Sequence, residues 1–194
     1  MGVKIILIGL PKSGTTSFQS LFERLGYKSY HQHMHNIAIG MKIKTNKKNN
    51  EPLLEGFEND CCITQLDICQ GTNNNYWPQI SDFKQLYYEN PDCIFILNKR
   101  DIPSLLQSWK KQIWRGVPLD KRLFRFNPEL VDQHNDKGFE KFVNDHYESV
   151  ETFFDNHKEA KFMTFDIIND DVSKLTQYIN IDKCTKMPHK NYKR

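Results

Sequence analysis

Apolar residues gather in short runs along this chain, and stretches with apolar residues at helical spacing separate the runs. Apolar, β-branched runs without alternating polar positions are typical of parallel strands that are covered on both faces. They predict strands within residues 3–8, 61–70, 93–100 and 160–168. Residues 27–31 are a candidate for one more short strand.

Between the strands, apolar residues recur at intervals of three and four, the spacing that places them on one face of a helix. The pattern predicts helices near residues 18–25, 80–87, 102–113, 139–154 and 172–179. Strands alternate with helices, and no sequence signal for a tight hairpin stands between them. We therefore expect residues 1–194 to form a single domain of class α/β, with three α/β/α layers around a central parallel sheet.

Two stretches depart from this pattern. Residues 41–52 are rich in lysine and asparagine and poor in apolar residues, so we expect a solvated loop there. Residues 115–138 contain Pro118 and Pro128 among basic and aromatic residues. A long irregular segment in a small domain is usually functional, and this one predicts a lid or the wall of a binding pocket.

The junction between the first strand and the first helix carries the most chemistry. Its sequence is Gly9-Leu10-Pro11-Lys12-Ser13-Gly14-Thr15-Thr16. A helix N-terminus presents N–H groups without helical partners, and a glycine lets an anion approach the backbone closely. Lys12 adds a positive charge, and the hydroxyl groups of Ser13, Thr15 and Thr16 add donors. The junction predicts a phosphate-binding loop, and the alternative is an ordinary turn with a surface lysine.

The two glycines of this loop have P-loop spacing, but the lysine is displaced. In a Walker A loop the lysine follows the second glycine directly, whereas here Thr15 stands at that position and Lys12 lies inside the loop. The segment Pro-Lys-Ser-Gly-Thr-Thr at 11–16 resembles the 5'-phosphosulfate loop of sulfotransferases that use 3'-phosphoadenosine-5'-phosphosulfate (PAPS). The resemblance implies the P-loop nucleotide-binding fold of that family, and it implies that this segment binds the 5' end of PAPS.

Arg100 ends the strand predicted at 93–100, and Ser108 lies eight residues later in the following helix. Sulfotransferases resemble this arrangement, because an arginine and a serine at that spacing bind the 3'-phosphate of their donor. The resemblance therefore implies the same role for Arg100 and Ser108. A guanidinium and a hydroxyl group suit a terminal phosphate.

The end of the chain is similar to the family only in part. Asp166 stands where many relatives carry a glutamate, and the segment Pro-His-Lys-Asn at 188–191 resembles the ending of some bacterial and fungal relatives. The Arg-Lys-Gly segment that covers the 3'-phosphate in the cytosolic animal enzymes is missing from the sequence. Lys190 or Arg194 is a candidate to replace it.

Sulfuryl transfer needs positive charge near the leaving oxygen and a base near the accepting group. Lys12 is the candidate for the charge. The cytosolic relatives carry a histidine base just after the second buried strand, where Asp67 stands here, and a lysine where Gln65 stands here. Asp67 is the first candidate for the base, with His31 or His33 as alternatives, and a purely structural Asp67 also stays open.

His31, His33 and His35 would lie on one side of an extended strand, as in some metal sites. No cysteine or carboxylate stands at ligand spacing, so a pocket histidine or surface histidines are preferred. The family reaction implies no metal, because a sulfonate carries less charge than a γ-phosphate.

The leading hypothesis is a PAPS-dependent sulfotransferase that acts on a hydroxyl or amine of a small molecule or glycan. One alternative is a P-loop nucleoside or small-molecule kinase, with Lys12 on the phosphates of Mg-ATP and Asp67 on magnesium. Another is a catalytically inactive nucleotide-binding protein. Gln65, and Ser17 at a position where the cytosolic enzymes carry tryptophan, keep that alternative open.

The composition limits the partners that we expect. The chain has 27 Lys and Arg against 24 Asp and Glu, and a formal net charge of +3 does not indicate a general nucleic-acid binder. No apolar stretch approaches the roughly 20 residues that span a bilayer, and no signal peptide precedes the first strand. We therefore expect a cytoplasmic protein without a membrane partner. The five cysteines lack C-x-x-C spacing and predict reduced thiols.

Overall fold

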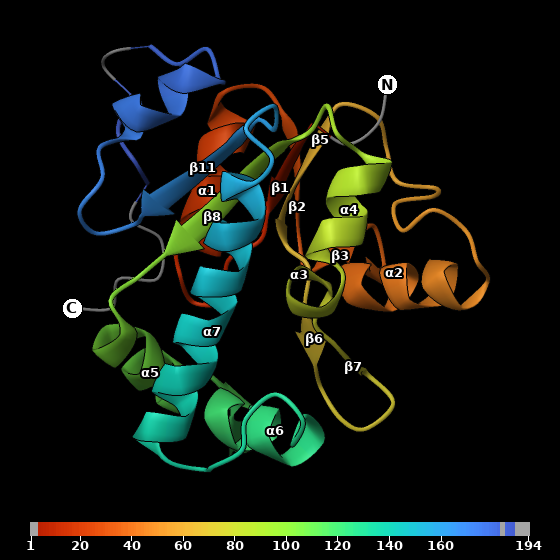
Figure 1. Ribbon diagram of the computed structural model, residues 1–194, viewed down its shortest axis with the longest axis vertical. Helices are drawn as coiled ribbons and strands as arrows, with labels where there is room; N and C mark the ends of the chain where they lie inside the picture. Colours follow the sequence, from red (N-terminus) through yellow and green to blue (C-terminus); the bar gives the residue numbers. More distant parts are fainter. Residues whose placement is uncertain (1–3, 183–184, 189–194) are drawn as a thin grey trace.

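A sheet of seven strands runs through the middle of the molecule (Figure 1). The computed structural model of the chain describes residues 4–182 and 185–188. Five of the strands are parallel neighbours, in the order β11-β8-β1-β5-β2. Their bounds are β1 (Ile5–Leu7), β2 (Lys28–His31), β5 (Cys61–Gln65), β8 (Ile94–Lys99) and β11 (Phe162–Asp166). Every predicted strand is present, including the candidate at 27–31, and the parallel sheet is confirmed.

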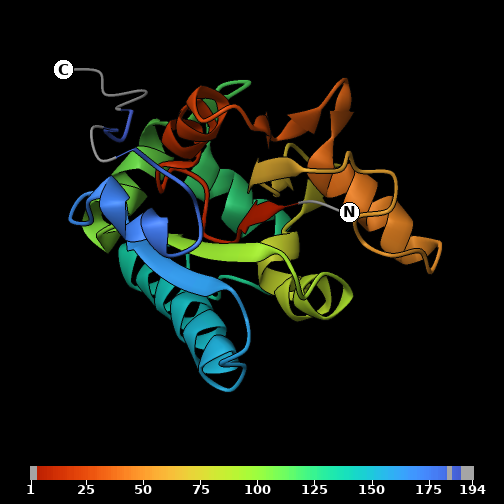
Figure 2. The same ribbon diagram turned by 90° about the horizontal axis from the view of Figure 1, so that it is seen from above.

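Helices cover both faces of the sheet, as the three-layer prediction requires. They are α1 (Thr15–Arg24), α2 (Ile39–Lys48), α3 (Pro78–Ser81), α4 (Phe83–Glu89), α5 (Ile102–Lys111), α6 (Leu119–Phe126), α7 (Asp136–Asp155) and the 3₁₀ helix η1 (Val172–Gln177). Figure 2 shows α1 and α7 on opposite sides of the sheet. Successive side chains of a strand point to opposite faces, so β1 contributes to two cores.

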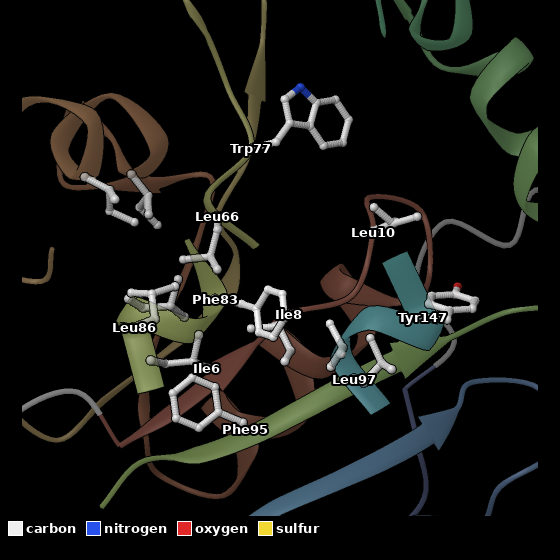
Figure 3. Packing of buried hydrophobic residues seen from close by; sticks show 14 of the residues in the cluster. Ile6, Ile8, Leu10, Leu66, Trp77, Phe83, Leu86, Phe95, Leu97 and Tyr147 are labelled. Carbon is white, nitrogen blue, oxygen red and sulfur yellow. The ribbon is translucent and has the colours of Figure 1, made fainter. Parts of the chain in front are cut away.

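The two cores hold the carboxyl ends of the strands in place. On one face, Ile5 packs with Phe18 of α1. On the other, Ile6 and Phe95 lie close to Leu86 of α4 (Figure 3). β1, β5 and most of β8 are buried along their length. Their ends are therefore rigid supports for the loops that follow.

The expectation of a sheet without hairpins was wrong. β3 (His33–Met34) and β4 (Ile37–Ala38) extend the sheet antiparallel to β2. Two small hairpins pair β6 (Ile68–Cys69) with β7 (Asn75–Tyr76), and β9 (Ile113–Trp114) with β10 (Val117–Pro118). In the last, Arg115 (φ 47°) and Gly116 (φ 77°) form the two-residue turn. Such turns usually carry asparagine or aspartate before the glycine, so the sequence signal was weak.

The prediction of a loop at 41–52 was wrong over most of this segment, because residues 39–48 form α2. Ile39 and Ile43 of this helix are fully buried in the core. The side-chain amide of Asn46 donates to the carbonyl oxygens of Leu53 and Glu55, at 3.0 and 2.9 Å. Packing and hydrogen bonds with distant residues thus form a helix that the local composition did not indicate.

The long loop expected at 115–138 was also wrong in part, since it contains β10 and α6. Leu119 and Leu123 of α6 are buried in the core. Residues 127–135 connect α6 to α7 without a helix or strand. Leu119 and Arg122 line a small hollow beside the main cavity, which agrees with the interpretation as a pocket wall.

The predicted helices are present with shifted ends. The helix expected at 102–113 ends at Lys111, and Ile113, expected in its buried stripe, lies in β9 and is 62% exposed. The helix expected at 80–87 is divided at Asp82 into α3 and α4. Asp101 caps α5, because its side chain accepts a hydrogen bond from the Ser104 N–H at 3.0 Å.

The described cysteines are buried, namely Cys61, Cys62, Cys69 and Cys93. Burial raises the pKa of each thiol, so these groups stay protonated at neutral pH. Within residues 4–182 and 185–188, no helix has the length and apolar character to cross a membrane.

Candidate functional site

The loop between β1 and α1 is held by side chains from β8, from the residue after it, and from α5 and α7. Its carbonyl oxygens accept hydrogen bonds from His146 Nε2 to Ile8, Trp109 Nε1 to Pro11, a guanidinium nitrogen of Arg100 to Lys12, and Asn98 Nδ2 to Ser13. The four distances lie between 2.8 and 3.1 Å. These contacts fix the loop before any ligand binds.

Asn98, near the end of β8, is the centre of this support. It is fully buried, and its Oδ1 accepts from the Gly9 N–H at 3.0 Å. Its Nδ2 donates to the Ser13 carbonyl at 3.0 Å and to Ser13 Oγ at 2.6 Å. A Cβ at Gly9 would lie 2.2 Å from the Asn98 carbonyl oxygen, so only glycine permits this approach.

The loop carries backbone strain at two positions. Gly14 has φ 87° and Lys12 has φ 73°, both in the left-handed region. The conformation suits glycine but costs energy for lysine, and such strain persists only where the surroundings enforce it. The hydrogen bonds to the neighbouring carbonyls of Pro11 and Ser13 provide that enforcement.

A cavity of about 620 Å³ lies over this loop, at the carboxyl end of the parallel strands. Its lining includes Pro11, Lys12, Gly14, Thr15, Thr16, Arg100 and Ser108. The two groups of residues predicted to bind opposite ends of one nucleotide therefore face the same space. Parallel strands end at one edge of the sheet, and β1 and β8 are neighbours, so the loops after them meet.

Ser13 is the predicted ligand-binding residue that does not line the cavity. Its side chain is fully buried, its hydroxyl group donates to the Leu10 carbonyl, and it accepts from Asn98. The structure therefore gives the Ser13 side chain a role in shaping the loop.

The described lining of the cavity is positively charged. It contains Lys12, Arg100 and Lys111 and no acidic residue. Burial and, secondarily, the nearby Arg100 charge lower the pKa of Lys12. Within the described chain, the buried Nε of Arg100 has no hydrogen-bond partner. A buried donor without a partner is costly, so the cavity suits an anion that accepts from Arg100.

Asp67 lies behind the loop and does not line the large cavity. Its Oδ2 accepts from Gln65 Nε2 at 3.1 Å, and its Oδ1 accepts from Gln79 Nε2 at 2.9 Å. Thr15 Oγ1 in turn donates to Gln65 Oε1 at 3.2 Å. A continuous chain of hydrogen bonds thus connects Thr15, at the start of α1, to a buried carboxylate.

The surroundings of Asp67 make it a better base than a surface aspartate. Burial raises its pKa to about 6, and the hydrogen bonds from Gln65 and Gln79 limit the rise. A carboxylate with a pKa near the working pH can accept a proton efficiently. Asp67 lines a hollow of about 80 Å³ that shares Pro11, Gln32, Gln65 and Gln112 with the large cavity.

The three histidines near residue 33 do not lie on one side of a strand. Gln32, with φ 60°, turns the chain between β2 and β3, and His31 pairs with His33 across that turn. His35 instead contacts Glu58 at 2.7 Å. Among the described residues no group of histidine, cysteine and carboxylate side chains could hold a metal ion.

His31 lines the large cavity, and His33 lines the smaller hollow. Burial, with a further contribution from the Lys12 charge, lowers the pKa of His31 to about 4. His31 is therefore neutral at pH 7. Both histidines are close enough to the cavities to remain alternatives for the base.

Of the residues predicted near the C-terminus, Asp166 lies within the described part of the chain, and Lys190 and Arg194 do not. The Asp166 carboxylate accepts from the N–H groups of Ile168 and Asn169, at 2.8 and 3.1 Å, and so shapes the turn after β11. That turn brings Ile167 and Ile168 to the cavity wall. Lys190, Asn191 and Arg194 lie outside the described residues, as does His189.

Sequence reasoning missed the residues that hold the loop from behind. The helical spacing at 102–113 indicates only a buried position for Trp109, and Asn98 and His146 belong to no motif. A buried polar residue near the end of an apolar strand was the available signal for Asn98. No local pattern indicated that His146 would reach Ile8.

A family model described as the sulfotransferase domain matches residues 4–194. The search of curated proteins found no match.

Proposed function

Because this chain belongs to the sulfotransferase domain family, we propose that it transfers the sulfuryl group of PAPS to a hydroxyl or amine of a small-molecule or glycan acceptor. The family supports sulfuryl transfer in general. One observation carries the choice of donor, because the loop at Lys12 and the pair of Arg100 and Ser108 line a single basic cavity. PAPS bears anionic groups at both its 5' and 3' positions.

The residues present fit this donor. The loop from Pro11 to Thr16 would hold the 5' end, and the unpartnered Nε of Arg100 would meet the 3'-phosphate together with Ser108. When bound, PAPS supplies an activated sulfuryl group and leaves as adenosine 3',5'-bisphosphate. The chain itself contributes position and charge, which dominate catalysis of such displacements.

Lys12 and Asp67 have the complementary tasks. Lys12 places positive charge where negative charge develops on the leaving oxygen, and the amides of the first turn of α1 assist it. Asp67 takes the proton from the accepting hydroxyl or amine as that group becomes the nucleophile. Gln65 positions the carboxylate and connects it to Thr15.

The same contacts disfavour the kinase alternative. A kinase would need Asp67 to bind magnesium beside the phosphates near Lys12. Here both carboxylate oxygens of Asp67 accept from glutamine amides, and Asp67 does not line the cavity with Lys12. The alternative of an inactive nucleotide-binding protein predicts the same nucleotide binding without transfer.

Two measurements test the proposal. Calorimetry should detect binding of adenosine 3',5'-bisphosphate, and labelled PAPS should give labelled products with a panel of alcohols, sugars and amines. Binding of Mg-ATP without binding of the bisphosphate would refute the choice of donor. Bisphosphate binding without transfer to any acceptor would favour the inactive alternative.

Variants test separately the residues proposed to bind the two ends of the donor. Lys12→Ala should abolish transfer and leave the fold intact. Arg100→Ala should weaken bisphosphate binding about 10- to 100-fold, because a hydrogen bond to a charged group contributes roughly 1.5–3 kcal/mol. Lys110→Ala is the matched control, since Lys110 lies on α5 but pairs with Asp136 away from the cavity. Equal binding and turnover in all three variants would show that the site is wrong.

A further inference from the structure

The small hollow beside the donor cavity has a chemistry of its own. It is lined by the turn after β2, the segment after β5, β9 and α6. It shares Pro11, Gln32, Gln65 and Gln112 with the donor cavity, so the two spaces are neighbours on either side of these residues. An acceptor has to approach the donor from such a neighbouring space.

Amide side chains dominate the polar lining of this hollow. Four of its residues are glutamines, namely Gln32, Gln65, Gln70 and Gln112. An amide side chain offers both donors and acceptors, and a hydroxyl group also donates and accepts. The lining therefore complements a ligand with several hydroxyl groups.

Two buried charged side chains make the hollow still more polar. Asp67 and Arg122 line it, and each is 4% exposed. Arg122 donates to the carbonyl of Cys69, to the carbonyl of Val117 at 3.2 Å and to Gln112 Oε1 at 2.5 Å. Among the described residues it forms no ion pair with a carboxylate within 4.0 Å.

An apolar acceptor would fit this lining poorly. It would remove water from the half-buried amides of Gln32, Gln70 and Gln112 without replacing the hydrogen bonds, and each polar group left unsatisfied is costly. A ligand with hydroxyl groups on neighbouring carbons would replace those bonds. The volume of about 80 Å³ admits only part of such a ligand, because pockets for whole drug-sized ligands start near roughly 300 Å³.

On the basis of the proposed function, we infer that this hollow is the acceptor subsite and that the acceptor is a hydroxyl-rich molecule of the sugar or cyclitol class. The accepting hydroxyl lies beside Asp67, and its neighbouring hydroxyl groups bind the glutamines. In the reaction, the acceptor oxygen forms a bond to sulfur and the sulfur–oxygen bond to the 5'-phosphate breaks. The proton of the hydroxyl goes to Asp67, and the bond electrons leave with the bisphosphate.

The first test compares polyols with apolar ring alcohols on the protein loaded with adenosine 3',5'-bisphosphate. Saturation-transfer NMR is measured with myo-inositol, methyl glucoside, cyclohexanol and 2-naphthol. The inference expects signals for at least one of the first two and weaker signals for cyclohexanol and naphthol. Preferred binding of cyclohexanol or naphthol, or no binding of either polyol, would overturn it.

The second test uses two glutamines that line different spaces. Gln70 lines the hollow and not the donor cavity, whereas Gln107 lines the donor cavity and not the hollow. Gln70→Leu should raise the KM or Kd of the polyol about 2- to 10-fold, the loss of one hydrogen bond, with unchanged bisphosphate affinity. Gln107→Leu should leave the polyol affinity unchanged. A Gln70→Leu variant with unchanged polyol affinity would contradict the inference.

The outcomes distinguish this inference from the function on which it rests. If the protein does not bind the bisphosphate, the proposed function fails first. If it binds the bisphosphate and transfers sulfate to 2-naphthol but not to the polyols, the function stands and the acceptor inference is wrong.

Discussion

Replacement of Asn98 by alanine tests whether its side chain stabilises the conformation of the loop between β1 and α1. The substitution removes three hydrogen bonds, from Gly9 N–H, to the Ser13 carbonyl and to Ser13 Oγ. Asn98 is fully buried, so the Gly9 N–H and the Ser13 carbonyl lose their partner away from solvent. At roughly 1–3 kcal/mol for each of the two unsatisfied groups, Asn98→Ala should lower the free energy of unfolding by about 2–6 kcal/mol.

Urea unfolding measures this loss, and two further variants calibrate it. Ser13→Ala removes one of the three bonds and also the bond from the Ser13 hydroxyl group to the Leu10 carbonyl, so it should cost about 1–3 kcal/mol. Asn156→Ala removes a hydrogen bond to the Thr152 carbonyl at an exposed position and should stay within about 0.5 kcal/mol of the parent. If the unfolding free energy falls most for Asn98→Ala, less for Ser13→Ala and least for Asn156→Ala, the loss comes from the contacts with the loop and not from the loss of an asparagine in general.

Asn98→Ala should also weaken the binding of adenosine 3',5'-bisphosphate under conditions in which the variant is folded. Ordering the backbone of one residue costs about 1–2 kcal/mol, so a loop that must order on binding should lose roughly tenfold in affinity. If the unfolding free energy of Asn98→Ala matches that of Asn156→Ala, Asn98 does not support the loop. Unchanged nucleotide affinity would show that the loop keeps its shape without Asn98.

Two pH predictions follow from the buried ionisable groups. If Asp67 is the base, kcat/KM should fall as the pH drops below about 6, and Asp67→Asn should remove most activity at every pH. The folded pKa of Asp67 exceeds its ordinary value of 3.8, so its contribution to stability is greatest below pH 3.8 and is lost as the pH rises through about 6. Unfolding of Asp67→Asn should lack this decline, and an identical pH profile in the variant would contradict the assignment. Burial lowers the pKa of His146 from 6.5 to about 4, so its contribution is complete above pH 6.5 and is lost as the pH falls towards 4. His146→Gln should be less sensitive to pH in this window, and equal loss of stability in both proteins on acidification would exclude His146 as a source.

The sequence by itself determined the parts that depend on neighbouring residues. The apolar run before Gly9, the break at 9–14 and the helical spacing after it predicted β1, the loop that follows and α1. Arg100 was also recognisable at a strand end, because the apolar run before it marks the strand. These features are local, because strand and helix periodicities and glycine conformations are properties of short segments.

The local pattern was insufficient where distant residues compete with it. The lysine-rich segment became α2 because Ile39 and Ile43 reach the core. The turn at Arg115 formed without the usual residue before its glycine. In both places, tertiary contacts outweigh the weak preferences of the segment.

Only the tertiary structure decided which residues meet at the site. The pairing of β1 with β8 brings Arg100 to the loop at Lys12, and α7 brings His146 to Ile8. It also separates Asp67 from the cavity over that loop and places it in the adjoining hollow. Such contacts depend on the order of strands in the sheet and on the packing of helices against it, and neither is written in the spacing of residues along the chain.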